Sequence, residues 1–358
     1  MLQIFHNVNI DWLKDRRAFI AVSIVLMLAG LVSAVVRQAT PGGTEAFNLG
    51  VDFKGGTVVT VKFKQRPTAE QINAELAKRG IHDAVVQLAT DKQDEALIKL
   101  PQLGTGSGSN AAEAQAEVDV GRTKVKEALN TFGPEGDAYR IVGTDAVGPI
   151  AGRQLRNQAI AVTLAALVGI LLYIAFRFEW TYGAAAVIAV FHDVLVTLGM
   201  FSVFQWEINL TVIAALLTLV GFSVNDTIVV FDRIRENLRL HRRESLYKIT
   251  NDSINQTLSR TVITSGLVFL SVLAMVIFGG DVLFGFSIAL LIGIVFGTYS
   301  SVAIASPIMV WWQQRLDTAD KAQATPLREG RAALGRGREP RPTKSSGVIK
   351  EPTGAARS

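Results

Sequence analysis

The segment Gly221–Asn237, GFSVNDTIVVFDRIREN, fixes the class of this chain. It ends an apolar run, Leu210–Phe231, that is long enough to cross a lipid bilayer as a helix. Asn225 and Asp226 lie inside this run, where a carboxylate is costly unless it faces a bundle interior or a water-filled path. We therefore predict a membrane helix with a functional buried acid at Asp226. The alternatives are that Asp226 is a capping or packing group near the helix end, and that Asn225 only holds helices together.

The composition indicates several membrane spans together with a sizeable aqueous domain. The 358 residues are 49% hydrophobic and 19% charged. The absence of cysteine excludes disulfides and thiolate metal sites, and the four scattered histidines have no metal-ligand spacing. No catalytic set of nucleophile, base and orienting group is visible, so we expect neither an enzyme nor a cofactor. The net charge of +5 lies beside apolar runs, where it is expected to set topology rather than to bind nucleic acid.

The first apolar run, Phe19–Val36, follows Lys14, Arg16 and Arg17. A signal peptide has the same layout, and the sequence Val32–Ala34 would serve as a cleavage site. The run is longer than the apolar part of most signal peptides, so an uncleaved anchor is the preferred interpretation. The basic residues place residues 1–18 in the cytoplasm.

Five further spans are predicted in the region 158–311, at about residues 159–176, 183–204, 208–231, 261–278 and 284–310. Lys and Arg outside the aqueous domain concentrate in the pieces that this topology places in the cytoplasm, including the loop 232–259 and the tail 312–358. All five tryptophans lie at predicted span ends, as expected for residues at a membrane interface. We predict six spans with both termini inside and a disordered basic tail. An alternative for the tail is an interaction with anionic lipid.

Residues 37–157 contain no run long enough to span a bilayer and are expected to form an outer α+β domain between spans 1 and 2. Alternating and helical patterns predict strands and helices in the order β-α-β-β-α-β, which is typical of a ferredoxin-like split βαβ fold. These elements are expected at Thr57–Phe63, Thr68–Arg79, Ala84–Leu88, Ala96–Leu100, Ala111–Phe132 and Tyr139–Val142. A capping-box pattern begins the first helix, the second helix is expected to fray near Gly121, and Gly104–Asn110 is predicted to be a flexible loop. Gly55 and Gly56 predict a tight turn into the first strand, because the surrounding pattern lacks the features of a phosphate-binding loop.

Ionisable residues enter apolar surroundings at three places: His192–Asp193, Asp226 and Arg260. Asp226 and Arg260 lie near the same edge of consecutive spans, so we predict that they come within pairing distance and form an ion-coupling element with Asn225. His192 and Asp193 form a polar pair that is either functional or a stabilising contact. Gly285, Gly293 and Gly297 predict close helix packing, within this chain or, alternatively, across a dimer seam.

Several motifs resemble the SecF branch of the SecD/SecF family of protein-export membrane proteins. They are NLGVDFKGGT, the Arg177–Trp180 link, His192–Asp193, GFSVNDTIVVFDRIREN, SRTVITS, FGG and GTYSSVAIASP, and they follow the family's order from about Gly50 to Pro307. The resemblance implies membership of the resistance–nodulation–division superfamily, whose six spans form half of a pseudo-symmetric bundle. The family's motif residues map onto Asp52, Phe53, Gly55, Gly56, Arg177, Glu179, Asp232, Arg233 and Arg235. One departure is Phe222, where the family more often has tyrosine; the Gly/Ser loop and the long basic tail are others.

The resemblance also implies a function. With SecD, such a protein assists the SecYEG channel and the SecA motor, and uses the proton-motive force to draw preproteins to the periplasmic side of the bacterial inner membrane. YajC and YidC are further implied partners. The family's transmembrane acid maps onto Asp226 and its basic partner onto Arg260. Two alternatives are a related exporter of small molecules or lipids, and a translocon scaffold without ion coupling. The coupling ion, proton or sodium, is left open.

Overall fold

The computed structural model describes residues 9–40, 45–81, 84–88, 94–100, 111–177, 179–316 and 318. The predicted flexible loop Gly104–Asn110 and residues 319–358 of the predicted tail lie outside this part of the chain. The chain divides into a unit of Met1–Val310 and a second unit of Trp311–Ser358. In the second unit, the guanidinium of Arg315 lies 4.6 Å from the centre of the Trp311 ring. The fold and the sites described below belong to the first unit.

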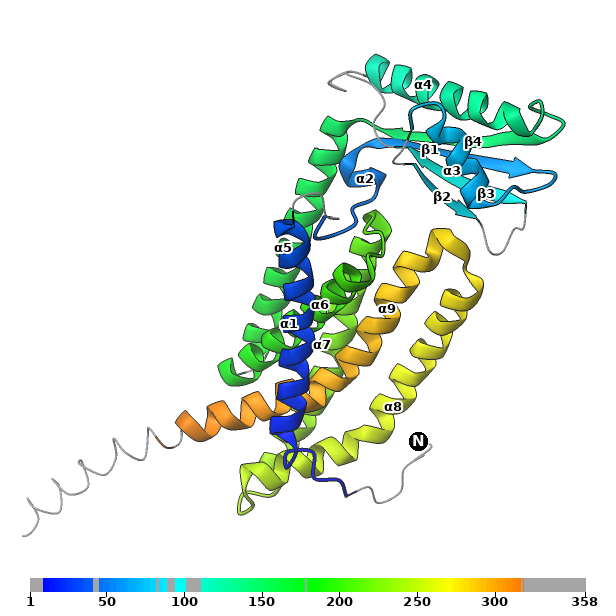
Figure 1. Cartoon of the computed structure of the whole chain (residues 1–358). Helices are drawn as coiled ribbons and strands as arrows, with labels where there is room; N and C mark the ends of the chain where they lie inside the picture. The colour runs from blue at the N-terminus through cyan, green and yellow to red at the C-terminus, as the bar shows by residue number, and fades with distance from the viewer. Residues whose placement is uncertain are drawn as a thin grey trace, which may run out of the picture. The chain divides into compact units, whose positions relative to one another are not determined.

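In the described part of the chain, six helices are long and apolar enough to cross a membrane, as predicted, and they run through Figure 1 as a bundle. Their bounds are α1 Arg16–Ala39, α5 Pro149–Arg177, α6 Trp180–Phe204, α7 Leu210–Leu240, α8 Leu246–Phe278 and α9 Gly280–Ser300. A short π-helical stretch, Ser301–Ala305, continues α9. Half or more of the apolar span is buried in α6, α7 and the α9 segment, against 17% or less in α1, α5 and α8. The first three therefore form the interior, and the other three form its periphery.

The helices α7 and α8 extend beyond the predicted spans. The segment 232–259, predicted as a loop, is helical except for residues 241–245. Its charged composition favoured a loop, but polar contacts between the two helices hold the extensions together. The amide of Asn237 donates to the Ser253 hydroxyl at 2.8 Å and to Gln256 at 3.0 Å. The hydroxyl of Ser245 caps the start of α8.

The glycines of α9 pack against α7. A methyl group on Gly293 would lie 2.5 Å from the Cδ1 of Leu219, and one on Gly297 would lie 3.2 Å from the Cβ of Ser223. Gly285, about two turns before Gly293, meets Val212 of α7 in the same way. Because lipid removes the hydrophobic incentive for helix association, such backbone proximity is what holds membrane helices together. The small-residue stripe is thus used for contacts within the chain.

The segment between α1 and α5 forms a small α+β domain with the predicted order of elements. These are β1 Gly56–Phe63, α3 Ala69–Ala77, β2 Val85–Leu88, β3 Glu95–Leu100, α4 Ala111–Leu129 and β4 Tyr139–Val147. The sheet has the order β2-β3-β1-β4 with every neighbouring pair antiparallel, which confirms the ferredoxin-like split βαβ fold. The capping box between Thr68 and Gln71 is present at the start of α3. Contrary to the expected fraying, α4 runs through Gly121, which lies against the Thr57 side chain.

Candidate functional site

Asp226 lies on α7 with 3% of its surface exposed. Its Oδ2 accepts a hydrogen bond from the hydroxyl of Ser265 on α8 at 2.8 Å. No ion pair neutralises the carboxylate within the part of the chain that the structure describes. A desolvated carboxylate with so little compensation is costly as an anion and is therefore suited to take up and release a proton.

Arg260 does not form the predicted ion pair with Asp226 among the described residues. Its side chain is exposed on α8, and it lies five residues before Ser265, the residue that contacts Asp226. Five residues of an α-helix correspond to a rotation of roughly 140° between the two side chains. Arg260 thus starts from a different face of α8 than Ser265, but its charge still acts electrostatically on Asp226. Asn225 is also exposed, on the outer side of α7 next to the inward-facing Asp226.

His192 and Asp193 meet at the centre of the bundle. The Nδ1 of His192 lies 2.9 Å from the Oδ1 of Asp193, and Asp193 is fully buried. The Oδ2 of Asp193 accepts hydrogen bonds from the hydroxyls of Ser223 on α7 at 2.5 Å and Ser300 on α9 at 2.8 Å. One carboxylate therefore joins α6, α7 and α9.

The serines around both carboxylates were not identified from the sequence. Ser223, Ser265 and Ser300 are each buried and donate to a carboxylate. A usable signal was present for Ser223, because it lies three residues before Asp226 and so close to it along the surface of α7. No local pattern identifies Ser265 or Ser300, because their helices meet α7 only in the folded bundle.

The α+β domain is joined to the start of α7 by backbone contacts. Leu49 forms an isolated parallel β-bridge with Ile208. The N–H of Ile208 donates to the carbonyl of Asn48 at 2.7 Å, and the N–H of Gly50 donates to the carbonyl of Ile208 at 2.8 Å. The carboxylate of Asp52 accepts from the N–H of Leu210, the first residue of α7, at 2.9 Å. These bonds tie the segment before β1 to the helix that carries Asp226.

The short helix α2, Val51–Lys54, and the following glycines complete this junction. Gly55 has φ +83° and Gly56 has φ +140°, which other residues rarely adopt, so this pair makes the predicted turn into β1. Phe53 is buried in a cluster with residues of α6, α7 and α9. The segment Asp52–Gly56 thereby forms the turn into the domain and also contacts the bundle.

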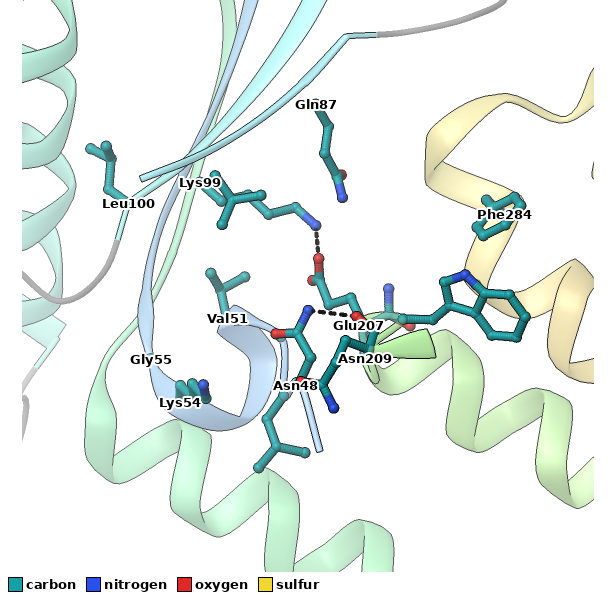
Figure 2. Close-up of a pocket in the computed structure, with 16 residues that line it drawn as sticks. Asn48, Val51, Lys54, Gly55, Gln87, Lys99, Leu100, Glu207, Asn209 and Phe284 are labelled. Carbon is teal, nitrogen blue, oxygen red and sulfur yellow. Dashed lines mark hydrogen bonds and ion pairs between the residues drawn. The ribbon is translucent and has the colours of Figure 1, made fainter. Parts of the chain in front are cut away.

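An ion pair closes the junction on its other side. Lys99 of β3 bonds to Glu207 of the link between α6 and α7, and both side chains are largely buried. Figure 2 shows this pair at a cavity of about 550 Å³. In the lining of the cavity, the amide of Asn48 donates to the carbonyl of Gln205. Phe284 marks the far wall of the cavity. The cavity therefore lies between the sheet and the ends of the membrane helices.

The remaining motif residues lie at the other end of the helices. Arg177 ends α5, and Glu179 occupies the N-cap position of α6 without a capping side-chain bond. Asp232, Arg233 and Arg235 lie on the extension of α7, where Arg233 donates to Gln256 and Glu236, both at 2.6 Å. Within the described residues, no cluster of three His, Cys, Asp or Glu side chains is arranged to hold a metal ion.

Comparison with known proteins agrees with these features. The family model described as protein export membrane protein SecD/SecF, C-terminal, matches residues 124–315, and the SecD/SecF GG motif matches residues 43–65. SecF of Koribacter versatilis is 41% identical over 381 aligned positions, which cover 87% of this chain and 94% of that protein. SecF of Pseudomonas aeruginosa is 37% identical and covers 85% and 91%.

Fused relatives extend the likeness to solved structures. The SecDF protein of Thermus thermophilus is 38% identical over 87% of this chain but 41% of its own length. The crystal structure of SecDF from that organism superimposes with a TM-score of 0.71 at 36% identity, and the match covers 86% of this chain and 39% of the SecDF chain. The chain thus corresponds to about two fifths of the fused protein. It belongs to the SecD/SecF family, a family of transporters rather than enzymes, as a multi-pass SecF subunit of the Sec protein translocase.

Proposed function

We propose that this SecF subunit works with SecD and uses the proton-motive force to promote preprotein translocation and release. The burial of Asp226, which accepts a hydrogen bond from Ser265 and has no ion pair within the described residues, carries this proposal. Protonation removes the charge that the bundle does not neutralise, so the balance between two arrangements of α7 and α8 depends on the proton gradient. The fusion of both subunits in the SecDF relatives supports SecD as the partner. SecYEG, SecA, YajC and YidC are proposed as further partners.

The junction gives this proton step a route to the outer domain. A movement of α7 acts directly on the segment before β1, because Asp52 caps the helix and Ile208 is bonded to Asn48 and Gly50. These contacts are direct hydrogen bonds, so a displacement of α7 displaces the segment before β1 as well. Arg260, which is exposed on α8, is proposed to engage a carboxylate in another state of the cycle or on the partner subunit.

We further propose that both termini and residues 241–245 lie in the cytoplasm and that the α+β domain lies in the periplasm. The distribution of Lys and Arg supports this orientation. Because the chain contains no cysteine, a single cysteine at Arg242 or at Val85 reports its own side of the membrane. In spheroplasts, a membrane-impermeant maleimide is expected to label V85C and not R242C. Labelling of R242C alone would reverse the proposed orientation.

The proton step is tested by measuring preprotein release from membranes with and without a proton gradient. Asp226→Asn is expected to abolish the gradient-dependent component, and Arg260→Met to reduce it, while SecD still co-purifies with both variants. Asp145→Asn, which changes an exposed carboxylate on β4, is the matched control and should behave as wild type. If Asp226→Asn kept the gradient-dependent component, the subunit would act as a scaffold without ion coupling.

A further inference from the structure

The pair His192–Asp193 carries more than a structural contact, because its hydrogen bonds suit two protonation states. The Ser300 hydroxyl has one proton and two acceptors within reach, the Oδ2 of Asp193 at 2.8 Å and the carbonyl of Gly297 at 3.1 Å. With an ionised carboxylate, Ser300 donates to Asp193. With a protonated carboxyl, the Asp193 O–H donates to Ser300, which donates in turn to Gly297. Both states are satisfied without displacement of a heavy atom.

The charge balance of the interior favours an exchangeable proton at this position. Neutral His192 and ionised Asp193 leave a net charge of −1 in a site where Asp193 is 0% and His192 is 5% exposed. One added proton makes the pair neutral, whether it resides on the imidazole or on the carboxyl, and removes a large desolvation cost. Asp193 pairs with His192, and no Lys or Arg among the described residues forms an ion pair with it.

Among the described residues, the side chains bonded to Asp193 from the neighbouring helices are serines and not titratable groups. On α7, Ser223 donates to Asp193. Asp226 lies nearly one turn further along α7 and accepts a hydrogen bond from Ser265 of α8. From α9 it receives Ser300, while the nearby Tyr299 hydroxyl donates to the carbonyl of Phe19 on α1 at 2.7 Å. The proton count of the pair is therefore set by its own two residues.

The second ring nitrogen of His192 is the atom at which the pair can accept the proton. Its Nε2 is buried and has no hydrogen-bond partner within the described part of the chain. Buried polar nitrogens are nearly always paired with protein or water, so an unpaired one marks a position where a water molecule or a proton binds. The imidazole can accept a proton at Nε2 while Nδ1 keeps its contact with Asp193.

From these observations we infer that His192 and Asp193 form a second proton-binding site, separate from Asp226 and coupled to it through α7. In the transfer, a water-borne proton binds the pair, whose net charge changes from −1 to 0; no other bond is made or broken. The charge-assisted hydrogen bonds from Ser223 and Ser300 weaken when the carboxylate is neutralised. Protonation therefore weakens the contacts of α6 with α7 and α9. Because Ser223 lies three residues before Asp226, this loosening acts on the helix that carries the first site.

This inference goes beyond the proposed function, which uses Asp226 alone, and it is tested by a readout other than export. Full-length protein in lipid nanodiscs is titrated with pH while infrared difference spectra record the C=O stretch of protonated carboxyl groups. Asp193→Asn is expected to remove one titrating carboxyl band that Asp226→Asn retains, and to shift the titration midpoint of the remaining band. Identical titrating bands in wild type and Asp193→Asn would overturn the inference.

Two milder variants keep the test decisive if Asp193→Asn does not fold. Ser300→Ala removes one donor and is expected to shift the midpoint of the Asp193 band. Ser287→Ala should leave it unchanged, because the hydroxyl of this other buried serine of α9 has no partner among the described residues. His192→Asn retains a side-chain amide near the position of Nδ1 but cannot take a proton, so it should shift the same midpoint. Unshifted midpoints in both Ser300→Ala and His192→Asn would refute a titrating pair. Failure of the proposed function would appear separately, as gradient-driven export by Asp226→Asn.

Discussion

The interiors of the α+β domain and of the membrane bundle both contain apolar clusters, but among the described residues only the bundle also buries carboxylates. The domain is filled with aliphatic side chains such as Val59, Ile98 and Leu129, each 0% exposed. The bundle interior places hydroxyls and carboxylates between its helices and brings backbones together at glycines. The difference follows from the solvent. Water drives apolar groups together, whereas lipid tails are as apolar as the helices, so packing contact and hydrogen bonding hold the bundle.

Removing aliphatic volume should therefore damage the domain most. Ile98→Ala in β3 is expected to lower the free energy of unfolding of the domain by about 2–5 kcal/mol, because it leaves a cavity in a fully buried position. Hydrogen exchange of the β-strand amides in the full-length protein measures this loss. Val85→Ala, on the exposed surface of the neighbouring strand β2, should change it by only about 0.5 kcal/mol. An equal effect of both variants would show that the sheet is not stabilised by this core.

Adding volume should damage the bundle instead. Gly293→Leu places its side chain against Leu219 and is expected to lower the free energy of unfolding by about 1–3 kcal/mol. A lower melting temperature in detergent measures this loss. Gly266→Leu on α8 is the matched control, because nothing lies within 4 Å of a methyl group at that position. If Gly293→Leu were as stable as Gly266→Leu, close contact between α7 and α9 would not be needed.

A single interhelical hydrogen bond should matter less. Thr227→Val keeps the shape of the side chain but removes the 2.9 Å bond to Ser301. The expected cost is about 0.6–1.7 kcal/mol, the range typical of hydrogen bonds between membrane helices. Thermal unfolding measures this cost against Thr218→Val, whose hydroxyl donates to the carbonyl of Ala214 on its own helix and to no other helix among the described residues. Equal melting temperatures of Thr227→Val and Thr218→Val would show that this interhelical hydrogen bond does not stabilise the bundle.

The smallest effect is expected from a charge on the aqueous domain. The contact with Lys78, followed by those with Arg79 and Thr131, lowers the pKa of Glu75 below its ordinary value. A carboxyl whose pKa falls on folding adds stability above its unfolded pKa, and this gain is lost as the pH drops through the folded value. Glu75→Gln should thus weaken the domain slightly at neutral pH and not at strongly acidic pH.

Hydrogen exchange at several pH values follows this difference. The exposed Glu127, for which the described structure shows no ion pair, provides the control: Glu127→Gln should not alter the acid dependence of domain stability. A loss for Glu75→Gln that is the same at neutral and acidic pH would point to packing rather than charge as its cause.

Much of the fold followed from the sequence because its signals are local. Run length and composition predicted six membrane helices, and alternation with turn residues predicted the β-α-β-β-α-β order of the domain. The capping box at Thr68 and the turn at Gly55 also involve residues that are close in the chain. The family resemblance rests on the same kind of signal, namely long motifs in a fixed order. Charge density misled the prediction for 232–259, because helices that leave the membrane become polar while remaining helical.

The tertiary structure alone decided which side chains meet. It left Arg260 exposed without an ion pair to Asp226 among the described residues, and it placed Ser265 against Asp226. It also brought Lys99 to Glu207 across 108 positions of the sequence. A helix places successive residues on different faces, and which face is buried depends on every neighbouring helix at once. The sequence thus determined that this chain spans a membrane with acids inside it, and the packing of α6, α7 and α9 determined what those acids touch.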